Sequence, residues 1–195
     1  MGSLAIKVED KFTYGDYLKW DDNERWELID GIAYTMTPAP RPIHQLVLGE
    51  LYYQLKSFFR GKRCQVFVAP FDVCLPESDE SDELITTVVQ PDISVVCDRT
   101  KINDAGCKGA PDLIVEILSP STAGKDQKTK LVKYERSGVR EYWIVDPLNR
   151  TVYVYLLGEN GVYERPAVYV EADSPEVRIF PGLVIDLGSV FSESV

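Results

Sequence analysis

Residues 111–119 read PDLIVEILS, and this stretch decides the fold class of the chain. Its apolar and β-branched residues predict a buried strand from Asp112 to Leu118. Glu116 lies inside this strand on the same face as Asp112, because alternate strand residues point the same way. A carboxylate is costly to bury unless a cation, a metal ion or hydrogen bonds compensate its charge. Glu116 is therefore the first candidate for a functional residue.

A second acid occupies a similar place earlier in the chain. Residues 90–96 read QPDISVV, which predicts that a strand from Val88 to Val96 carries Asp92. If the two strands are neighbours, Asp92 approaches Glu116. Carboxylate and carbonyl oxygens are the ligands that Mg²⁺ prefers, so these two acids and the backbone carbonyl of Ile117 form a candidate site for Mg²⁺ or Mn²⁺. Such an ion polarises a phosphate and acidifies an attacking water.

A lysine completes this candidate site. A cation near the two acids would offset the negative charge that develops during hydrolysis. The next helix is predicted from about Thr122 to Ser137, and Lys130 falls on its apolar stripe. Two alternatives remain open for Lys130: a buried stem whose amine reaches solvent, or an i,i+4 pair with Asp126. Together, Asp92, Glu116 and Lys130 are the candidate catalytic set for metal-dependent phosphodiester cleavage.

The rest of the pattern predicts a single α/β domain spanning residues 1–195. The strand–helix–strand unit from 112 to 146 predicts a parallel crossover within one mixed sheet flanked by helices. The other expected elements, in chain order, are a helix at 14–18, a hairpin at 25–36 with its turn at Asp30-Gly31, a helix from 43 to about 61, a strand at 65–75 broken at Pro70, a strand at 141–146, and a tail hairpin of 151–157 with 161–165.

Composition narrows the function classes. The net charge of −10 argues against a protein that coats nucleic acid through bulk charge. Two basic segments, 56–63 and 125–140, are either phosphate-binding faces or ordinary solvated helix surface. No segment approaches the ~18 apolar residues of a membrane span. The first residues lack the apolar core of a secretory signal, so we expect a cytoplasmic protein without a membrane partner.

The cysteines predict no metal centre. Cys64, Cys74, Cys97 and Cys107 have no paired short spacing, and the chain has only 1 histidine, so a zinc site is not expected. Because three of the four lie in apolar, strand-like runs, we expect buried free thiols in a reducing compartment.

The motifs also resemble a known family. The run PDLIVEILSPST, the spacing Asp126-x-x-x-Lys130, Tyr134 and the segment GVREYWIVDP at 138–147 are similar to the Uma-two family of restriction endonucleases, in the PD-(D/E)XK nuclease superfamily. The resemblance implies a restriction-endonuclease-like core with extra N- and C-terminal β-hairpins. It extends over most of the chain through WELIDG at 26–31, TPAP before His44, QPDISVV at 90–96 and FPGLVIDL at 180–187.

The resemblance also implies roles for individual residues. Asp92 resembles the metal ligand of the Pro-Asp element, and Glu116 resembles the acid of the (D/E)XK element. The superfamily pattern expects a lysine where this chain has Leu118, and Lys130 resembles a relocated lysine on the following helix. The implied activity is Mg²⁺-dependent (or Mn²⁺-dependent) endonucleolytic cleavage of DNA by a homodimer. The lysine missing at 118 and the acidic charge keep open a second function, a non-catalytic interaction module on a nuclease-derived fold.

Three further side chains are candidates for contacts to the metal or the substrate. Glu50 lies on the first long helix, where this superfamily often places an acid of the metal site; alternatively it is an exposed helix acid. His44 either contacts a phosphate or shuttles a proton near neutral pH, or else caps or packs the helix start. Asp112 either assists the metal or simply begins its strand.

Overall fold

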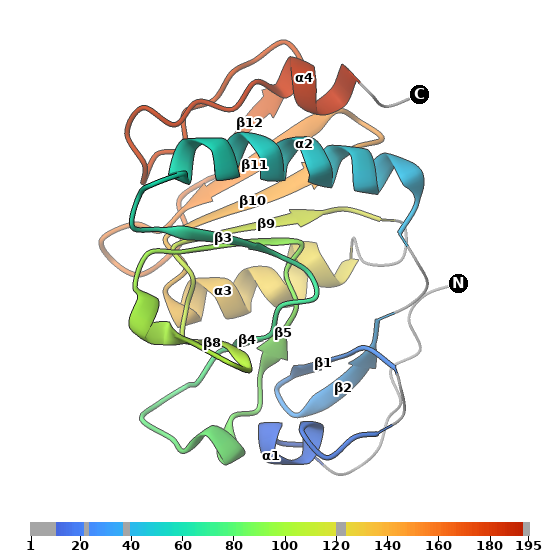
Figure 1. The fold of residues 1–195 in the computed structure, drawn as a ribbon, viewed down its shortest axis with the longest axis vertical. Coiled ribbons are helices and arrows are strands. Elements are labelled where there is room, and N and C mark those ends of the chain that lie inside the picture. The colour runs from blue at the N-terminus through green and yellow to red at the C-terminus, as the bar shows by residue number, and fades with distance from the viewer. Residues whose placement is uncertain (1–10, 22–23, 37–39, 120–123, 193–195) are drawn as a thin grey trace.

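The computed structural model describes residues 11–21, 24–36, 40–119 and 124–192 (Figure 1). The predicted α/β class is confirmed, but the strands form two six-stranded sheets instead of one mixed sheet. The central sheet has the order β12 (Ala167–Val170), β11 (Thr151–Leu156), β10 (Glu141–Asp146), β9 (Leu113–Ile117), β6 (Ile93–Val96), β3 (Gln65–Val68). The hairpin sheet has the order β2 (Ile32–Thr35), β1 (Trp26–Ile29), β5 (Val88–Val89), β4 (Val73–Cys74), β8 (Gly106–Lys108), β7 (Ile102–Asn103).

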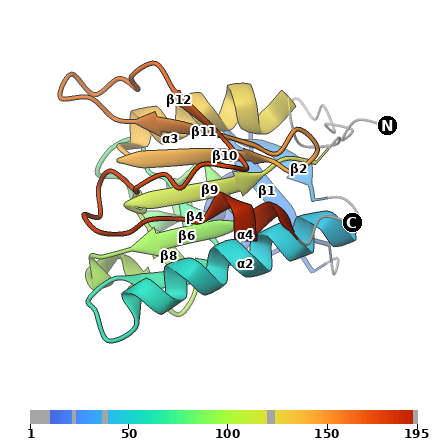
Figure 2. The same ribbon diagram turned by 90° about the horizontal axis from the view of Figure 1, so that it is seen from above.

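The helices cover both faces of the central sheet. Figures 1 and 2 show α2 (Pro42–Phe59) and α4 (Leu187–Ser192) together on one face. Helix α3 (Leu131–Ser137) and the hairpin sheet lie on the other face, and α1 (Tyr14–Tyr17) packs against the far side of the hairpin sheet. The remaining elements are short helical turns, η1 (Asp82–Leu84), η2 (Arg99–Lys101) and the π-helical η3 (Lys125–Lys130).

Strand β9 shows how the alternation of residues divides the core. Leu113, Val115 and Ile117 belong to the apolar cluster under α2, whereas Ile114 and Leu118 belong to the cluster that contains Tyr134 of α3. Glu116 shares the face of Ile114. As predicted, β9 and β10 pair in parallel and are joined through the helix between them.

Two predicted strands each divide between the two sheets, and a proline lies at both divisions. The expected strand 88–96 is β5 in the hairpin sheet and β6 in the central sheet, with Pro91 between them. The segment 65–75 divides in the same way at the predicted break, where the Ala69–Pro70 peptide is cis. Proline has no backbone N–H for a strand ladder, so a continuous strand ends at each site.

Two other expectations need correction. The predicted helix from 122 begins, within the described residues, as the π-helical turn η3 and continues as α3; its first two residues lie outside the described part. Gly138 ends it with a φ of 84°, as expected. Residues 161–165 form no strand and contribute only the single bridge Leu157–Tyr163, because β11 pairs instead with β12.

The cysteine prediction is half right. Cys74 and Cys107 are free and buried, but Cys64 and Cys97 form a disulfide. The register that pairs Gln65 with Val96 places these two cysteines opposite each other, one step beyond β3 and β6. In the described part of the chain, no helix is long and apolar enough to cross a membrane.

Candidate active site

The pairing of β6 with β9 makes the strand that follows Asp92 a neighbour of the strand that carries Glu116. The strands are antiparallel, with Ile93 opposite Val115 and Ser94 opposite Ile114. Asp92 immediately precedes Ile93 and Glu116 immediately follows Val115, so the two acids lie at the same end of this strand pair.

Asp92 is anchored through one of its two carboxylate oxygens. Its Oδ2 accepts a hydrogen bond from the backbone N–H of Ile117 at 2.7 Å and lies 3.2 Å from Nε2 of His44, near the start of α2. Within the described residues Oδ1 makes no hydrogen bond, and the side chain is 19% exposed. Asp92 is thus held at the end of β9 with one oxygen available to a ligand from solvent.

Glu116 is buried and receives two donors from the helical segment after β9. Its Oε1 accepts from Lys130 Nζ at 2.8 Å and from the Tyr134 hydroxyl at 2.7 Å. Glu116 and Lys130 are both only 3% exposed. This burial does not fit the alternative of a Lys130 amine that reaches solvent; the other alternative, a pair with Asp126, involves a side chain outside the described part of the structure.

Sequence reasoning missed one residue of this group. Glu27 of β1 is 0% exposed, and its Oε1 lies 2.7 Å from Lys130 Nζ. The same oxygen accepts a hydrogen bond from the backbone N–H of Gln90 at 3.1 Å. An acid inside an apolar strand was the criterion that selected Glu116, and residues 26–29, Trp-Glu-Leu-Ile, satisfy it as well. Lys130 therefore lies between two buried carboxylates.

Two of the predicted acids make their contacts elsewhere. The carboxylate of Glu50 accepts from Gln54 Nε2 at 2.9 Å, and Gln54 also bonds to the backbone of Asp186 ahead of α4. Asp112 accepts from the backbone N–H of Cys97 at 2.8 Å and from Arg140 at 3.3 Å. These contacts favour a helix-surface role for Glu50 and a strand-start role for Asp112.

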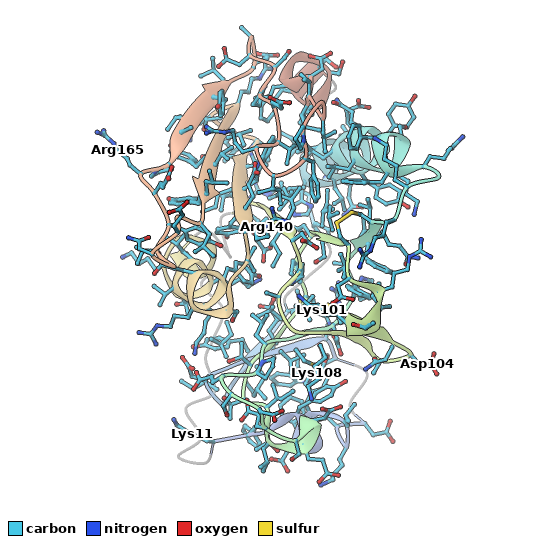
Figure 3. The ribbon with its side chains drawn as sticks, turned by 90° about the vertical axis from the view of Figure 1, so that its left-hand side faces the viewer. Lys11, Lys101, Asp104, Lys108, Arg140 and Arg165 are labelled. Carbon is cyan, nitrogen blue, oxygen red and sulfur yellow. A yellow bond between two sulfur atoms is a disulfide. The ribbon has the colours of Figure 1, made fainter. Side chains whose placement is uncertain are left out.

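The basic segment 125–140 is less basic at the surface than its sequence indicates. Lys130 and Lys133 are buried against carboxylates, Lys133 against Asp30 and Glu77. Arg140 lies at the surface (Figure 3), where its side chain is 55% exposed and pairs with Asp112. Burial of two lysines leaves a smaller cationic face than expected.

A polar network continues from Gln90 into the hairpin sheet. The Gln90 side-chain carbonyl accepts from Arg25 Nε at 3.0 Å and from Arg25 Nη2 at 2.6 Å. Its amide donates to Asp72 Oδ1 at 2.8 Å, and the Tyr17 hydroxyl donates to the same oxygen at 3.2 Å. These bonds connect Gln90, two positions before Asp92, to Arg25 on one side and to Asp72 on the other.

This network makes stability depend on pH through Asp72. Burial raises the pKa of the Asp72 carboxyl above its ordinary value near 3.8. At pH values between the ordinary pKa and the raised pKa of Asp72, the folded state binds more protons than the unfolded state. The contribution of Asp72 to stability therefore falls as pH rises. Asp72→Asn removes this titration while keeping an acceptor oxygen. We expect the free energy of unfolding of Asp72→Asn, relative to wild type, to increase with pH across this window in urea titrations. Parallel curves for the two proteins would contradict the prediction.

Comparison with known proteins identifies a family for this chain. A family model described as "Uma2: Putative restriction endonuclease" matches residues 14–188. The chain belongs to the Uma2 family. It is 25% identical over 156 residues to the uncharacterized protein slr1290 of Synechocystis sp., covering 77% of each chain. It is also similar in fold to a crystal structure from Anabaena variabilis, described as a putative nuclease belonging to DUF820, with a TM-score of 0.73, 22% identity, and coverage of 93% of this chain and 98% of that one.

Membership of the Uma2 family and the nuclease-like fold support a nuclease function at a coarse level. The donor set is compatible with a hard divalent cation. Mg²⁺ keeps several waters and is usually bound through one or two carboxylates, which Asp92 and Glu116 supply. Among the described residues, no group of three or more His, Cys, Asp or Glu side chains forms a metal cage.

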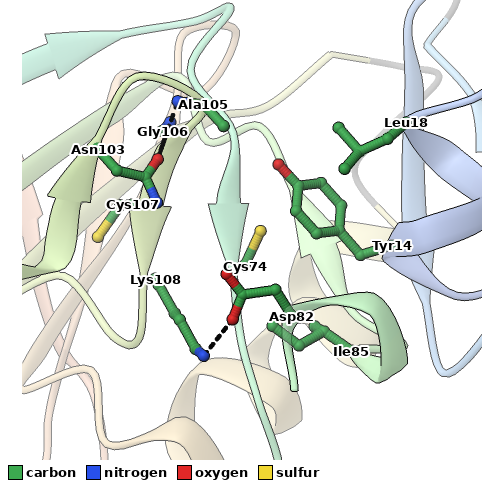
Figure 4. A pocket seen from close by; sticks show the side chains of 10 residues that line it. All are labelled: Tyr14, Leu18, Cys74, Asp82, Ile85, Asn103, Ala105, Gly106, Cys107 and Lys108. Atoms are coloured by element: carbon green, nitrogen blue, oxygen red, sulfur yellow. Dashed lines mark hydrogen bonds and ion pairs between the residues drawn. The ribbon is translucent and has the colours of Figure 1, made fainter. Parts of the chain in front are cut away.

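A cavity of about 170 Å³ lies on the hairpin sheet and is lined by none of these candidates (Figure 4). Tyr14, Leu18 and Cys74 line it, and the ion pair of Asp82 with Lys108 lies at its side. Burial raises the pKa of the Cys74 thiol to about 12 and that of Cys107 to about 11, so both thiols stay protonated near neutral pH. This cavity offers no activated nucleophile.

Proposed function

We propose that this Uma2 protein is an endonuclease that hydrolyses DNA phosphodiester bonds with Mg²⁺ or Mn²⁺. Its active site would consist of Asp92, Glu116 and Lys130. Two observations support the proposal: β6, which follows Asp92, pairs with β9, which carries Glu116, and Lys130 Nζ lies 2.8 Å from Glu116.

The side chains divide the work of the reaction. Asp92 and Glu116 would hold the cation, with Ile117 contributing its backbone carbonyl. The bound cation would supply charge neutralisation at the phosphate and a more acidic water. Lys130 would orient the water and offset negative charge as the phosphate is attacked.

His44 has a place in this scheme beside Asp92. Its ring Nε2 lies 3.2 Å from Asp92 Oδ2, and the His44 side chain is 10% exposed. A histidine in this position would orient the Asp92 carboxylate so that Oδ1 faces the ligand side. Contact with a substrate phosphate is the second role proposed for it.

A plasmid-nicking assay tests the proposal. We expect the purified protein to nick supercoiled DNA with millimolar Mg²⁺ or Mn²⁺ and to stop when EDTA is added. The double variant Asp92→Ala, Glu116→Ala should leave the plasmid intact, because it lacks both carboxylate ligands. Equal nicking by the wild type and the double variant would refute the proposal, since the activity would then come from another site or a contaminant.

A non-catalytic interaction module is the second candidate function. Leu118 stands where the superfamily pattern expects a lysine, and the net charge of −10 opposes DNA binding. This alternative predicts no heat of binding when Mn²⁺ is titrated into the protein at millimolar concentration. The nuclease proposal predicts binding that is lost in the double variant. DNA as the substrate, a homodimeric state and a cytoplasmic location remain predictions.

A further inference from the structure

Glu27 makes two contacts through one buried oxygen. Its Oε1 lies 2.7 Å from Lys130 Nζ and accepts the backbone N–H of Gln90 at 3.1 Å. Lys130 belongs to the helical segment after β9, whereas Gln90 stands two residues before Asp92. A single carboxylate of the hairpin sheet thus joins the lysine to the segment that carries the predicted metal ligand.

The β1–β2 hairpin determines where Glu27 points. Asp30 and Gly31 have φ values of 53° and 80° and form the turn of this hairpin. Leu28 belongs to the apolar cluster against α1, so Glu27 and Ile29 face the opposite way, toward α3. The local sequence therefore directs an acid into the space between the two sheets.

Stability alone gives little reason for three buried charges at this place. Apolar residues of similar volume often stabilise a protein as well as a buried ion pair does, or better. Lysine, however, has a long and flexible side chain whose amine needs fixed partners to keep one position. Two carboxylates from different sheets, Glu27 and Glu116, provide such partners.

We propose that Glu27 is a positioning residue of the nuclease site, which fixes Lys130 Nζ relative to Glu116 and to the Asp92 segment. This inference rests on the proposed function, because it assigns Lys130 a task in cleavage. Glu27 acts through Lys130 and does not ligate the cation. The hairpin sheet, which carries none of the three predicted catalytic residues, thereby contributes to the reaction.

The test compares Glu27→Gln with the wild type in steady-state DNA cleavage. Glutamine keeps the shape and one acceptor oxygen but removes the charge. We expect kcat to fall by about 10²-fold, as for a misplaced catalytic group, with KM for DNA changed less than about 3-fold. The alkaline limb of the rate profile should move to lower pH, because the ammonium group would lose one neighbouring negative charge. The Mn²⁺ affinity, measured by calorimetry, should stay within about 3-fold of wild type because both proposed ligands are intact.

Two further variants test whether the effect comes from the position of the Glu27 carboxylate, from its charge, or only from the burial of an acid. Glu27→Asp keeps the charge but shortens the side chain, so kcat should fall by about 10-fold without a change in the pH profile. It also serves as the deciding variant if Glu27→Gln does not fold. Glu141→Gln is the matched control, because Glu141 is also 0% exposed but bonds to Trp143 and Ile179 and shares the α2 face of the central sheet with Trp143. Its kcat and pH profile should equal those of wild type.

Each outcome is decisive. A wild-type kcat and pH profile in Glu27→Gln, or a wild-type kcat in Glu27→Asp, would overturn the positioning role while leaving the nuclease proposal intact. A loss of Mn²⁺ binding in Glu27→Gln as large as that in Glu116→Gln would make Glu27 a ligand and overturn the inference in another way. An inactive wild-type protein would refute the proposed function and this inference together.

Discussion

Lys130→Met is expected to lower the free energy of unfolding by about 3–5 kcal/mol and to abolish DNA cleavage. The substitution removes the ammonium group that lies 2.7 Å from Glu27 and 2.8 Å from Glu116. Both carboxylates have side chains at most 5% exposed, so they would stay buried after losing this ammonium group. Urea denaturation followed by circular dichroism measures the stability, and plasmid nicking measures the activity.

Lys133→Met provides the matched control on the same helix. Lys133 is also buried, but its partners Asp30 and Glu77 have side chains that are 49% and 64% exposed. Solvent can compensate these two acids when the lysine is lost, so we expect a destabilisation below about 1 kcal/mol. Equal losses in the two lysine variants would show that burial of the carboxylates does not control the effect.

A triple variant separates stability from catalysis at the same place. Lys130→Met combined with Glu27→Gln and Glu116→Gln removes all three charges of this group. We expect it to recover most of the lost stability, because neutral side chains of similar shape often replace buried ion pairs without penalty. Cleavage should remain absent. Recovery of cleavage together with stability would remove Lys130 and Glu116 from the catalytic set.

The second large effect is expected from neutralising Asp92 or Glu116 one at a time. Asp92→Asn and Glu116→Gln keep the size of each side chain, but each removes one negative charge from the pair proposed to hold the cation. We expect each to reduce the rate of Mg²⁺-dependent cleavage by about 10²–10³-fold, a loss typical of removing one electrostatic contact in an active site. Initial rates should be measured below the unfolding temperature of each variant, since both residues also accept hydrogen bonds that stabilise the fold.

Glu50→Gln is the control for these two variants. Glu50 was an acid predicted for the metal site, but its carboxylate bonds to Gln54 on the side of α2 toward α4. We expect its cleavage rate to stay within about 3-fold of wild type, a change too small for the loss of a metal ligand. A loss as large as that of Asp92→Asn would return Glu50 to the metal site. Wild-type cleavage by Asp92→Asn or Glu116→Gln would refute the two-carboxylate site.

Local sequence patterns predicted those elements whose residues interact mainly with their chain neighbours. The apolar run of β9, the helical spacing of α2, the Asp30-Gly31 turn and the stop at Gly138 all lie where expected. Periodicity and turn chemistry act over a few residues, so they are readable without a fold. The same alternation correctly assigned Glu116 to the face that meets Lys130 and Tyr134.

Local sequence patterns did not predict which distant segments pair with each other. Prolines 70 and 91 interrupt two predicted strands, but nothing near them indicates that each half joins a different sheet. The disulfide between Cys64 and Cys97 likewise depends on the register of β3 with β6. Such pairings are decided by which surfaces become buried together, a property of the whole chain.

The sequence by itself therefore indicated Asp92, Glu116 and Lys130 as candidates. It also predicted the strand that carries Glu116 and the helical segment that carries Lys130. Only the tertiary structure decided which acids meet. It brought Glu27, from a hairpin far from Glu116 in the chain, to the same lysine, and it placed Glu50 and Asp112 in other contacts. The physical reason is that a buried charge selects its partner by proximity in the folded core, where water no longer competes for it.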